Sequence, residues 1–177
     1  MNPLLSRKTF LIRGSLTAAA AFVALPRLGG QNPSPEASPA PPAIPDRGPQ
    51  IESARVREFV IAGHSNLEKV KEMLAAQPAL INATWDWGGG DFETALGGAS
   101  HMGRPDIAEF LLAHNARLDL FAAAMLGKLE IVQAAVAAFP GIVQVPGPHK
   151  IPLLAHAEKG GATAVVDFLK SLGPANS

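Results

Sequence analysis

The chain has 177 residues, no cysteine, and equal numbers of basic and acidic side chains, 15 of each, for a formal net charge of zero. This length suits one domain with appendages, and the lack of cysteine excludes disulfides and Cys-ligated zinc. Residues 1–50 hold five Lys/Arg and two acidic residues, which leaves 10 basic and 13 acidic side chains for the rest. The larger part is therefore mildly acidic and lacks the concentrated basic face that a nucleic-acid-binding protein needs.

Residues 1–30 have the order of an export signal. Three basic residues precede a 12-residue apolar segment at 14–25, which is too short to cross a hydrocarbon layer of ~30 Å. Residues 6–11, Ser-Arg-Lys-Thr-Phe-Leu, resemble the twin-arginine signal with Lys in place of the second Arg. We expect an exported protein, periplasmic or in the cell envelope, that meets the membrane only if this segment is uncleaved.

A proline-rich linker follows the signal. Residues 31–50 contain seven prolines and too few apolar residues to form a core, so we expect a disordered, extended spacer. Residues 51–177 then form the folded domain.

Four segments of this domain share one pattern, in which a turn precedes apolar residues at helical spacing. Ser65, Gly103, Gly127 and Gly161 occupy equivalent turn positions, and they are 38, 24 and 34 residues apart. These spacings scatter around the 33-residue period of one known repeat class. After the second turn, Pro105 suits the first position of a helix, because its missing N–H would be unpaired there.

The pattern resembles ankyrin repeats, whose unit contains Thr-Pro-Leu-His, two short helices and a projecting finger. Thr94-Ala95-Leu96-Gly97 keeps the Thr and Leu of the tetrapeptide, and Ile151-Pro152-Leu153-Leu154 keeps the Pro and Leu. The resemblance covers roughly residues 51–173 and implies an all-α helical solenoid of about four helix-turn-helix repeats. In this register, the seams between second helices contain Leu111, Ile131, Val132 and Val165.

The most unusual local sequence is Trp-Asp-Trp-Gly-Gly-Gly-Asp-Phe at residues 85–92. The ankyrin resemblance places it in a finger, where exposed aromatic side chains would be binding hot spots. Alternatively, Trp85, Trp87 and Phe92 fold back and complete the core. We expect at least one tryptophan to be buried in either case.

No pattern of catalytic or metal-binding residues stands out. The five histidines, His64, His101, His114, His149 and His156, include no pair at the i, i+4 spacing that places two metal ligands on one helix face. The resemblance places His64 and His101 at equivalent inner positions, but stacked helices lie ~8–10 Å apart, which is long for co-ligation. We therefore expect no enzyme, no metal site and no cofactor.

The function implied by the resemblance is non-catalytic binding of an unidentified protein partner through the concave face and the long finger. Met102, Met125 and Leu126 would make the centre of that face apolar, or they pack in the core if the register is shifted by one. The alternatives are a membrane-tethered structural envelope protein and a small metal-dependent hydrolase. The predicted partner-binding residues are His64, Asp86, Trp87, Asp91, Phe92, His101, Met102, Met125, Leu126, Glu158 and Lys159.

Overall fold

The computed structural model describes residues 48–173. The described residues all belong to one compact unit of the chain, 46–177. The predicted signal at 1–30 and nearly all of the predicted linker at 31–50 lie outside the described residues. Between residues 48 and 173, no helix is both long and apolar enough to cross a membrane.

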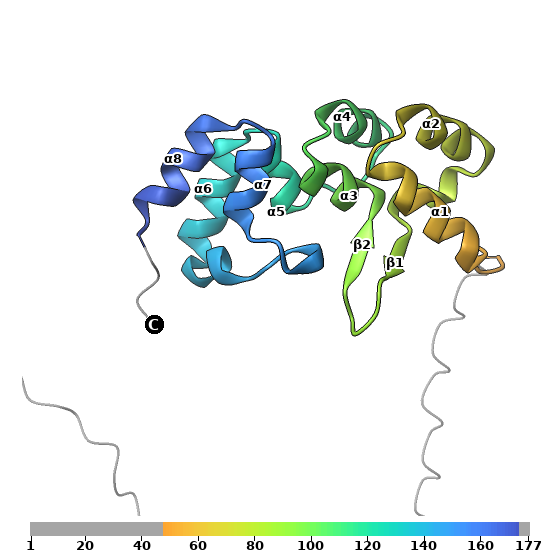
Figure 1. The fold of residues 1–177 in the computed structure, drawn as a ribbon, viewed down its shortest axis with the longest axis horizontal. Helices are drawn as coiled ribbons and strands as arrows, with labels where there is room; N and C mark the ends of the chain where they lie inside the picture. Colours follow the sequence, from red (N-terminus) through yellow and green to blue (C-terminus); the bar gives the residue numbers. More distant parts are fainter. Residues whose placement is uncertain (1–47, 174–177) are drawn as a thin grey trace, which may run out of the picture. The chain divides into compact units, whose positions relative to one another are not determined.

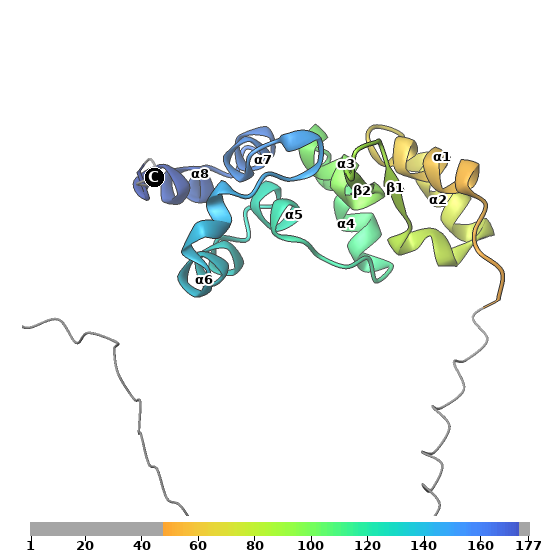
Figure 2. The same ribbon diagram turned by 90° about the horizontal axis from the view of Figure 1, so that it is seen from below.

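The described part of the chain is mostly helical, which confirms the all-α expectation at that level. Each odd-numbered helix packs against the next helix in the chain, and α1, α3, α5 and α7 contact one another in that order (Figures 1 and 2). Among the even-numbered helices, α2 contacts α4 and α6 contacts α8. The α-helices are α1 (Ser53–Gly63), α2 (Leu67–Ala76), α3 (Ala95–Met102), α4 (Pro105–Ala113), α5 (Leu120–Met125), α6 (Leu129–Ala138), α7 (Leu153–Lys159) and α8 (Thr163–Ser171). Three 3₁₀ turns are η1 (Pro78–Asn82), η2 (Pro140–Gln144) and η3 (Pro148–Lys150).

Side-chain caps explain where α3 and α5 begin. The hydroxyl of Thr94 accepts a 3.0 Å hydrogen bond from the backbone N–H of Gly97 at the start of α3, and Asp119 accepts one of 2.7 Å from Ala122 at the start of α5. Pro105 is the first residue of α4, as its sequence position predicts. Because the cap of α3 is also the last residue of a strand, the strand and α3 are joined without a linker.

The core consists of two clusters of buried apolar side chains. The first joins α1 to α4 with part of α5, and the second joins α5 to α8. Leu111, Val132 and Val165 are fully buried, as expected, but Ile131 is 44% exposed. The expectation for Ile131 is wrong because the next residue, Val132, is the one that α6 presents to the core.

A short hairpin is the only β-structure in residues 48–173. Strands β1 (Thr84–Asp86) and β2 (Phe92–Thr94) pair antiparallel, with Trp85 opposite Glu93. The hairpin extends away from the helices beside α1 and α3 (Figure 1). The three glycines 88–90 that close it have φ of 121°, 65° and 85°, a region that side chains disfavour. Trp85 and Trp87 are both half-buried, so the expectation of one buried tryptophan is wrong.

Candidate functional site

Four segments that are distant in sequence meet at the base of the hairpin. They are the C-terminal end of α1, strand β2, the last turn of α3 and the turn η3 before α7. Each contributes one side chain, and the four side chains, His64, Glu93, His101 and His149, have ligand atoms that all lie within 4.8 Å of one another. We call these four residues the His/Glu cluster.

Glu93 is the centre of the His/Glu cluster. Its side chain has no solvent exposure, and the Nε2 atoms of all three histidines approach its carboxylate. His64 Nε2 lies 3.3 Å and His149 Nε2 lies 3.4 Å from Oε2, and His101 Nε2 lies 2.9 Å from Oε1. Despite that distance, His101 Nε2 and Glu93 Oε1 are both buried without a hydrogen-bond partner.

The three imidazoles are in mutual contact as well as in contact with Glu93. The ring centroids of His64 and His101 are 4.8 Å apart, and those of His101 and His149 are 5.1 Å apart. The expectation that His64 and His101 lie too far apart to bind one metal ion is therefore wrong. The separation of two helix axes does not set the separation of side chains that extend toward each other from adjacent helices.

Glycines permit the close packing on which the cluster depends. A Cβ on Gly63 would lie 2.5 Å from the backbone oxygen of Ala95, so the absence of a side chain lets α1 approach α3. A Cβ on Gly98 would lie 2.7 Å from His64 Nδ1. The ring of His64 thus occupies space that any other residue at position 98 would take.

An outer set of hydrogen bonds orients the cluster. The indole Nε1 of Trp87 donates to Glu93 Oε2 at 2.8 Å. His64 Nδ1 lies 2.9 Å from the carbonyl oxygen of Val60, and His149 Nδ1 lies 3.0 Å from Asp91 Oδ2. A carbonyl and a carboxylate only accept, so Nδ1 carries the proton in both rings and, in the neutral form, Nε2 presents its lone pair to the cluster.

Asp91 holds His149 at two points, since its Oδ1 also accepts a 2.9 Å hydrogen bond from the backbone N–H of His149. This bond ties the turn η3 to the tip of the hairpin. His149 and the following Lys150 have φ of 56° and 59°, a left-handed conformation that is unfavourable for residues with a side chain. Such strain persists where the surroundings fix it and is common at functional sites.

The electrostatic balance of the cluster favours a charged pair. Burial by itself would raise the pKa of Glu93, but interactions with His101, His64 and Trp87 outweigh it and hold the pKa well below its ordinary value. The contact with Glu93 raises the pKa of His64, against the opposing effect of burial. Glu93 is therefore a carboxylate at neutral pH, and it attracts a cation to the centre of the cluster.

The structure brings together four of the predicted partner-binding residues, His64, Trp87, Asp91 and His101. Glu93 and His149 were missed: Glu93 is a lone acid between Phe92 and Thr94, and His149 lies in a turn with no helical register. The one signal for His149 was its position in the turn-rich stretch Gly-Pro-His-Lys at residues 147–150.

The other predicted residues are scattered over different environments. Phe92 and Met102 are exposed, and Asp86 is an exposed residue that accepts a hydrogen bond from the backbone of Gly88. Met125 is 2% exposed and packs in the core, so it is not part of an apolar surface as one reading expected, and Leu126 is half-buried. Glu158 and Lys159 are exposed at the end of α7.

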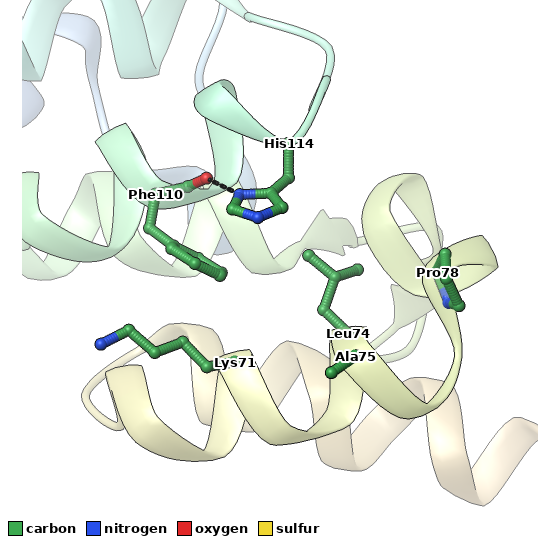
Figure 3. A pocket seen from close by; sticks show the side chains of 6 residues that line it. All are labelled: Lys71, Leu74, Ala75, Pro78, Phe110 and His114. Carbon is green, nitrogen blue, oxygen red and sulfur yellow. Dashed lines mark hydrogen bonds between the residues drawn. The ribbon is translucent and has the colours of Figure 1, made fainter.

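A separate hollow of about 380 Å³ lies between α2 and α4, away from the His/Glu cluster (Figure 3). Leu74, Phe110 and His114 line it together with Lys71, Ala75 and Pro78. His114 Nδ1 bonds the carbonyl oxygen of Phe110 at 2.8 Å. This hollow shares no residue with the His/Glu cluster or with the predicted partner-binding set.

Comparisons with known proteins identify no family and no function for this site. A scan against protein-family models, a search of curated proteins and a search of solved structures each found no match to the chain.

Proposed function

We propose that this chain is a non-catalytic, ankyrin-like module that binds another protein through the face formed by the hairpin and α3. The four related segments support the ankyrin-like part of the proposal. The packing of helices in successive pairs, with odd-numbered helices in contact in chain order, is compatible with a solenoid of about four repeats.

The observation that carries the binding proposal is the exposure of two large apolar side chains beside the cluster. Phe92 on β2 is 60% exposed and Met102 at the end of α3 is 43% exposed. Burying one such side chain is worth about 1.5–3 kcal/mol, and aromatic residues are frequent hot spots. Both residues belong to the segment that runs from β2 through α3, and strand pairing and the Thr94 cap hold this segment in place before a partner binds.

Affinity capture with the full chain as bait tests this proposal. The bait is compared with a Phe92→Ser, Met102→Ser variant and with a matched control, Phe139→Ser, Val145→Ser, whose wild-type residues are 70% and 55% exposed near η2. We expect one protein of the source organism's envelope extract to be retained by the wild type and the control and lost from the first variant. Retention by all three baits, or by none, would contradict the proposal.

The proposed location is the periplasm or cell envelope, on the basis of the signal-like sequence at 1–30. If that segment is uncleaved, the chain becomes the membrane-tethered envelope protein of the first alternative. Sequencing the N-terminus of the native protein distinguishes the two, because a cleaved chain would begin downstream of the apolar segment at 14–25.

The second alternative, a small metal-dependent hydrolase, draws on the His/Glu cluster. Hydrolysis at zinc needs a coordination position open to water. Turnover of generic ester or phosphoester substrates by the wild type that disappears in His101→Ala would favour this alternative over the non-catalytic proposal.

A further inference from the structure

The His/Glu cluster has a set of donors that no protein-binding role requires. Four separate segments contribute three imidazoles and one carboxylate, whose ligand atoms lie close together. Of the four residues, Glu93 is the one that is fully buried. We propose that His64, Glu93, His101 and His149 bind one divalent transition-metal ion, and that zinc is the ion that fits.

The arrangement of lone pairs is the first argument. His64 and His149 have their Nδ1 protons committed to Val60 and Asp91, so the neutral rings point Nε2 lone pairs at the Glu93 carboxylate, 3.3 and 3.4 Å away. Two acceptors at this distance repel each other unless a proton or a metal cation lies between them. A metal ion at the centre would take the place of those protons and attract all four ligand atoms at once.

The distances are the second argument. Zinc binds histidine nitrogen and carboxylate oxygen at about 2.0–2.2 Å in a tetrahedron, so neighbouring ligand atoms lie about 3.3 Å apart. His64 Nε2 and His149 Nε2 lie 3.3 and 3.4 Å from Glu93 Oε2, which matches this separation, and His101 Nε2 lies 2.9 Å from Glu93 Oε1. All four ligand atoms lie within 4.8 Å of one another, so closing the longest separation from at most 4.8 Å to about 3.3 Å would complete a coordination sphere.

The unpaired atoms are the third argument. Glu93 Oε1 and His101 Nε2 are both buried and, although they contact each other, neither makes a hydrogen bond, which is costly for polar atoms away from water. They face each other across the cluster at 2.9 Å. Coordination of one ion would satisfy both atoms at once.

The outer hydrogen bonds match those of known metal sites. A metal-bound histidine commonly donates its other N–H to a backbone carbonyl or a carboxylate, and a ligating carboxylate is itself hydrogen-bonded. Val60 and Asp91 serve His64 and His149 in this way, and Trp87 serves Glu93. Asp91 is thus a positioning residue for His149.

The ligand count indicates what the ion does. Four protein ligands complete the tetrahedral sphere that zinc takes in structural sites, and no position is left for a reacting water. The ion would connect α1, β2 and α3 with the turn η3. It would therefore stabilise the binding face and would not turn over a substrate.

Zinc binding by the full chain tests the proposal. Protein stripped with a chelator is titrated with zinc by calorimetry, and cobalt(II) is added in parallel because its visible absorption is strong only in a four-coordinate site. His101→Ala and Glu93→Gln remove ligands, and His114→Ala is the matched control because His114 is exposed and outside the cluster. Circular dichroism reports whether each variant folds.

Two further variants keep the test decisive if a core substitution fails to fold. His149→Asn places a residue that tolerates positive φ on the exposed turn. Asp91→Asn leaves all four ligands in place and replaces one of the two oxygens that accept from His149 by a donor. We expect one zinc per chain in the wild type and in His114→Ala. Asp91→Asn should lower the affinity about 10–100-fold, and loss of His149 should lower it further.

The proposal fails if the wild type retains no zinc, or if His149→Asn and Asp91→Asn bind zinc as tightly as the wild type. It also fails if His114→Ala weakens binding as much as the cluster variants, because the ion would then be held by surface histidines. A weak, six-coordinate cobalt spectrum would overturn the closed four-ligand site.

Discussion

Glu93 is a fully buried carboxylate whose neighbours keep it ionised. Removing an ionised carboxylate from water is strongly unfavourable unless it is paired and hydrogen-bonded. Trp87 donates to one of its oxygens, and three imidazoles surround it. A residue in this position is stable only in the presence of positive charge, either as protonated histidine or as a metal ion.

Protonation of histidine provides that charge in the metal-free protein. The sign of the pH dependence of stability follows from the shifted pKa values of Glu93 and His64. The pKa of Glu93 lies below its ordinary value of 4.5, so its contribution to stability is present above pH 4.5 and is lost as the pH falls. The pKa of His64 lies above 6.5, so its contribution is full below pH 6.5 and is lost as the pH rises through the shifted value. The pair should stabilise the fold most between pH 4.5 and 6.5.

Urea unfolding in the presence of a chelator measures this effect in the wild type and in Glu93→Gln. We expect the difference in unfolding free energy between them to be largest in that window and to shrink on both sides. His156, whose pKa is lowered mainly by burial, is present in both proteins, and the charge of Glu93 is the smallest of the influences on that pKa, so its share of the difference is small. A difference that keeps growing above neutral pH would show that His64 and Glu93 do not form a charged pair.

At the scale of the element, α3 depends on a glycine that helix propensity would disfavour. Replacing a mid-helix glycine by alanine normally stabilises a helix by about 0.5–1 kcal/mol. At Gly98 the new Cβ would lie 2.7 Å from His64 Nδ1, so the ring would have to leave the carbonyl of Val60. We expect Gly98→Ala to lower zinc affinity at least about 10-fold and to bring no gain in stability.

Gly141→Ala is the matched control for Gly98→Ala. A Cβ at position 141 would meet nothing within 4 Å, and the residue lies in η2, away from the cluster. Zinc titration of both variants measures the difference. Wild-type affinity in Gly98→Ala would mean that the observed orientation of His64 is not needed for the site.

Two residues on the second helices of successive pairs offer a direct test of the core. Leu111 on α4 is fully buried, whereas Ile131 on α6 is 44% exposed. We expect Leu111→Ala to cost about 2–5 kcal/mol of unfolding free energy and Ile131→Ala about 0.5 kcal/mol. Urea midpoints measure both. Equal losses would show that Ile131 is buried in solution and that the assigned face of α6 is wrong.

How much of the molecule could be predicted from sequence depends on the range of the interaction involved. Local signals such as Pro105 at a helix start predict elements correctly because they act within a few residues. The His/Glu cluster depends on the distance between α1 and α3 and on the path of the turn before α7. Neither follows from periodicity, which is why Glu93 and His149 were missed although His64 and His101 were selected.

At the scale of the whole described domain, the cluster joins two parts with separate cores. His64, Glu93 and His101 belong to the first half, whose buried cluster spans α1 to α4 and part of α5, and His149 belongs to the turn that leads into α7 of the second. The halves are also connected by the packing of α5 against α3 and α7, by the packing of α3 against α7, and by the hydrogen bonds between Asp91 and His149. A bound ion would add a link between the hairpin and the second half.

Hydrogen exchange with and without zinc tests this link. Zinc at about 100 times its dissociation constant should stabilise the folded chain by about 2.7 kcal/mol, so exchange should slow in the hairpin at residues 84–94 and, in the same titration, in the turn at residues 147–151. That turn already contacts the first half at Asp91 and Glu93, so the comparison with His149→Asn is what identifies His149 as a ligand. In His149→Asn we expect the turn to lose its protection. If zinc protects only the hairpin in the wild type, the ion is held by the first half alone, and the two halves are not joined through the metal.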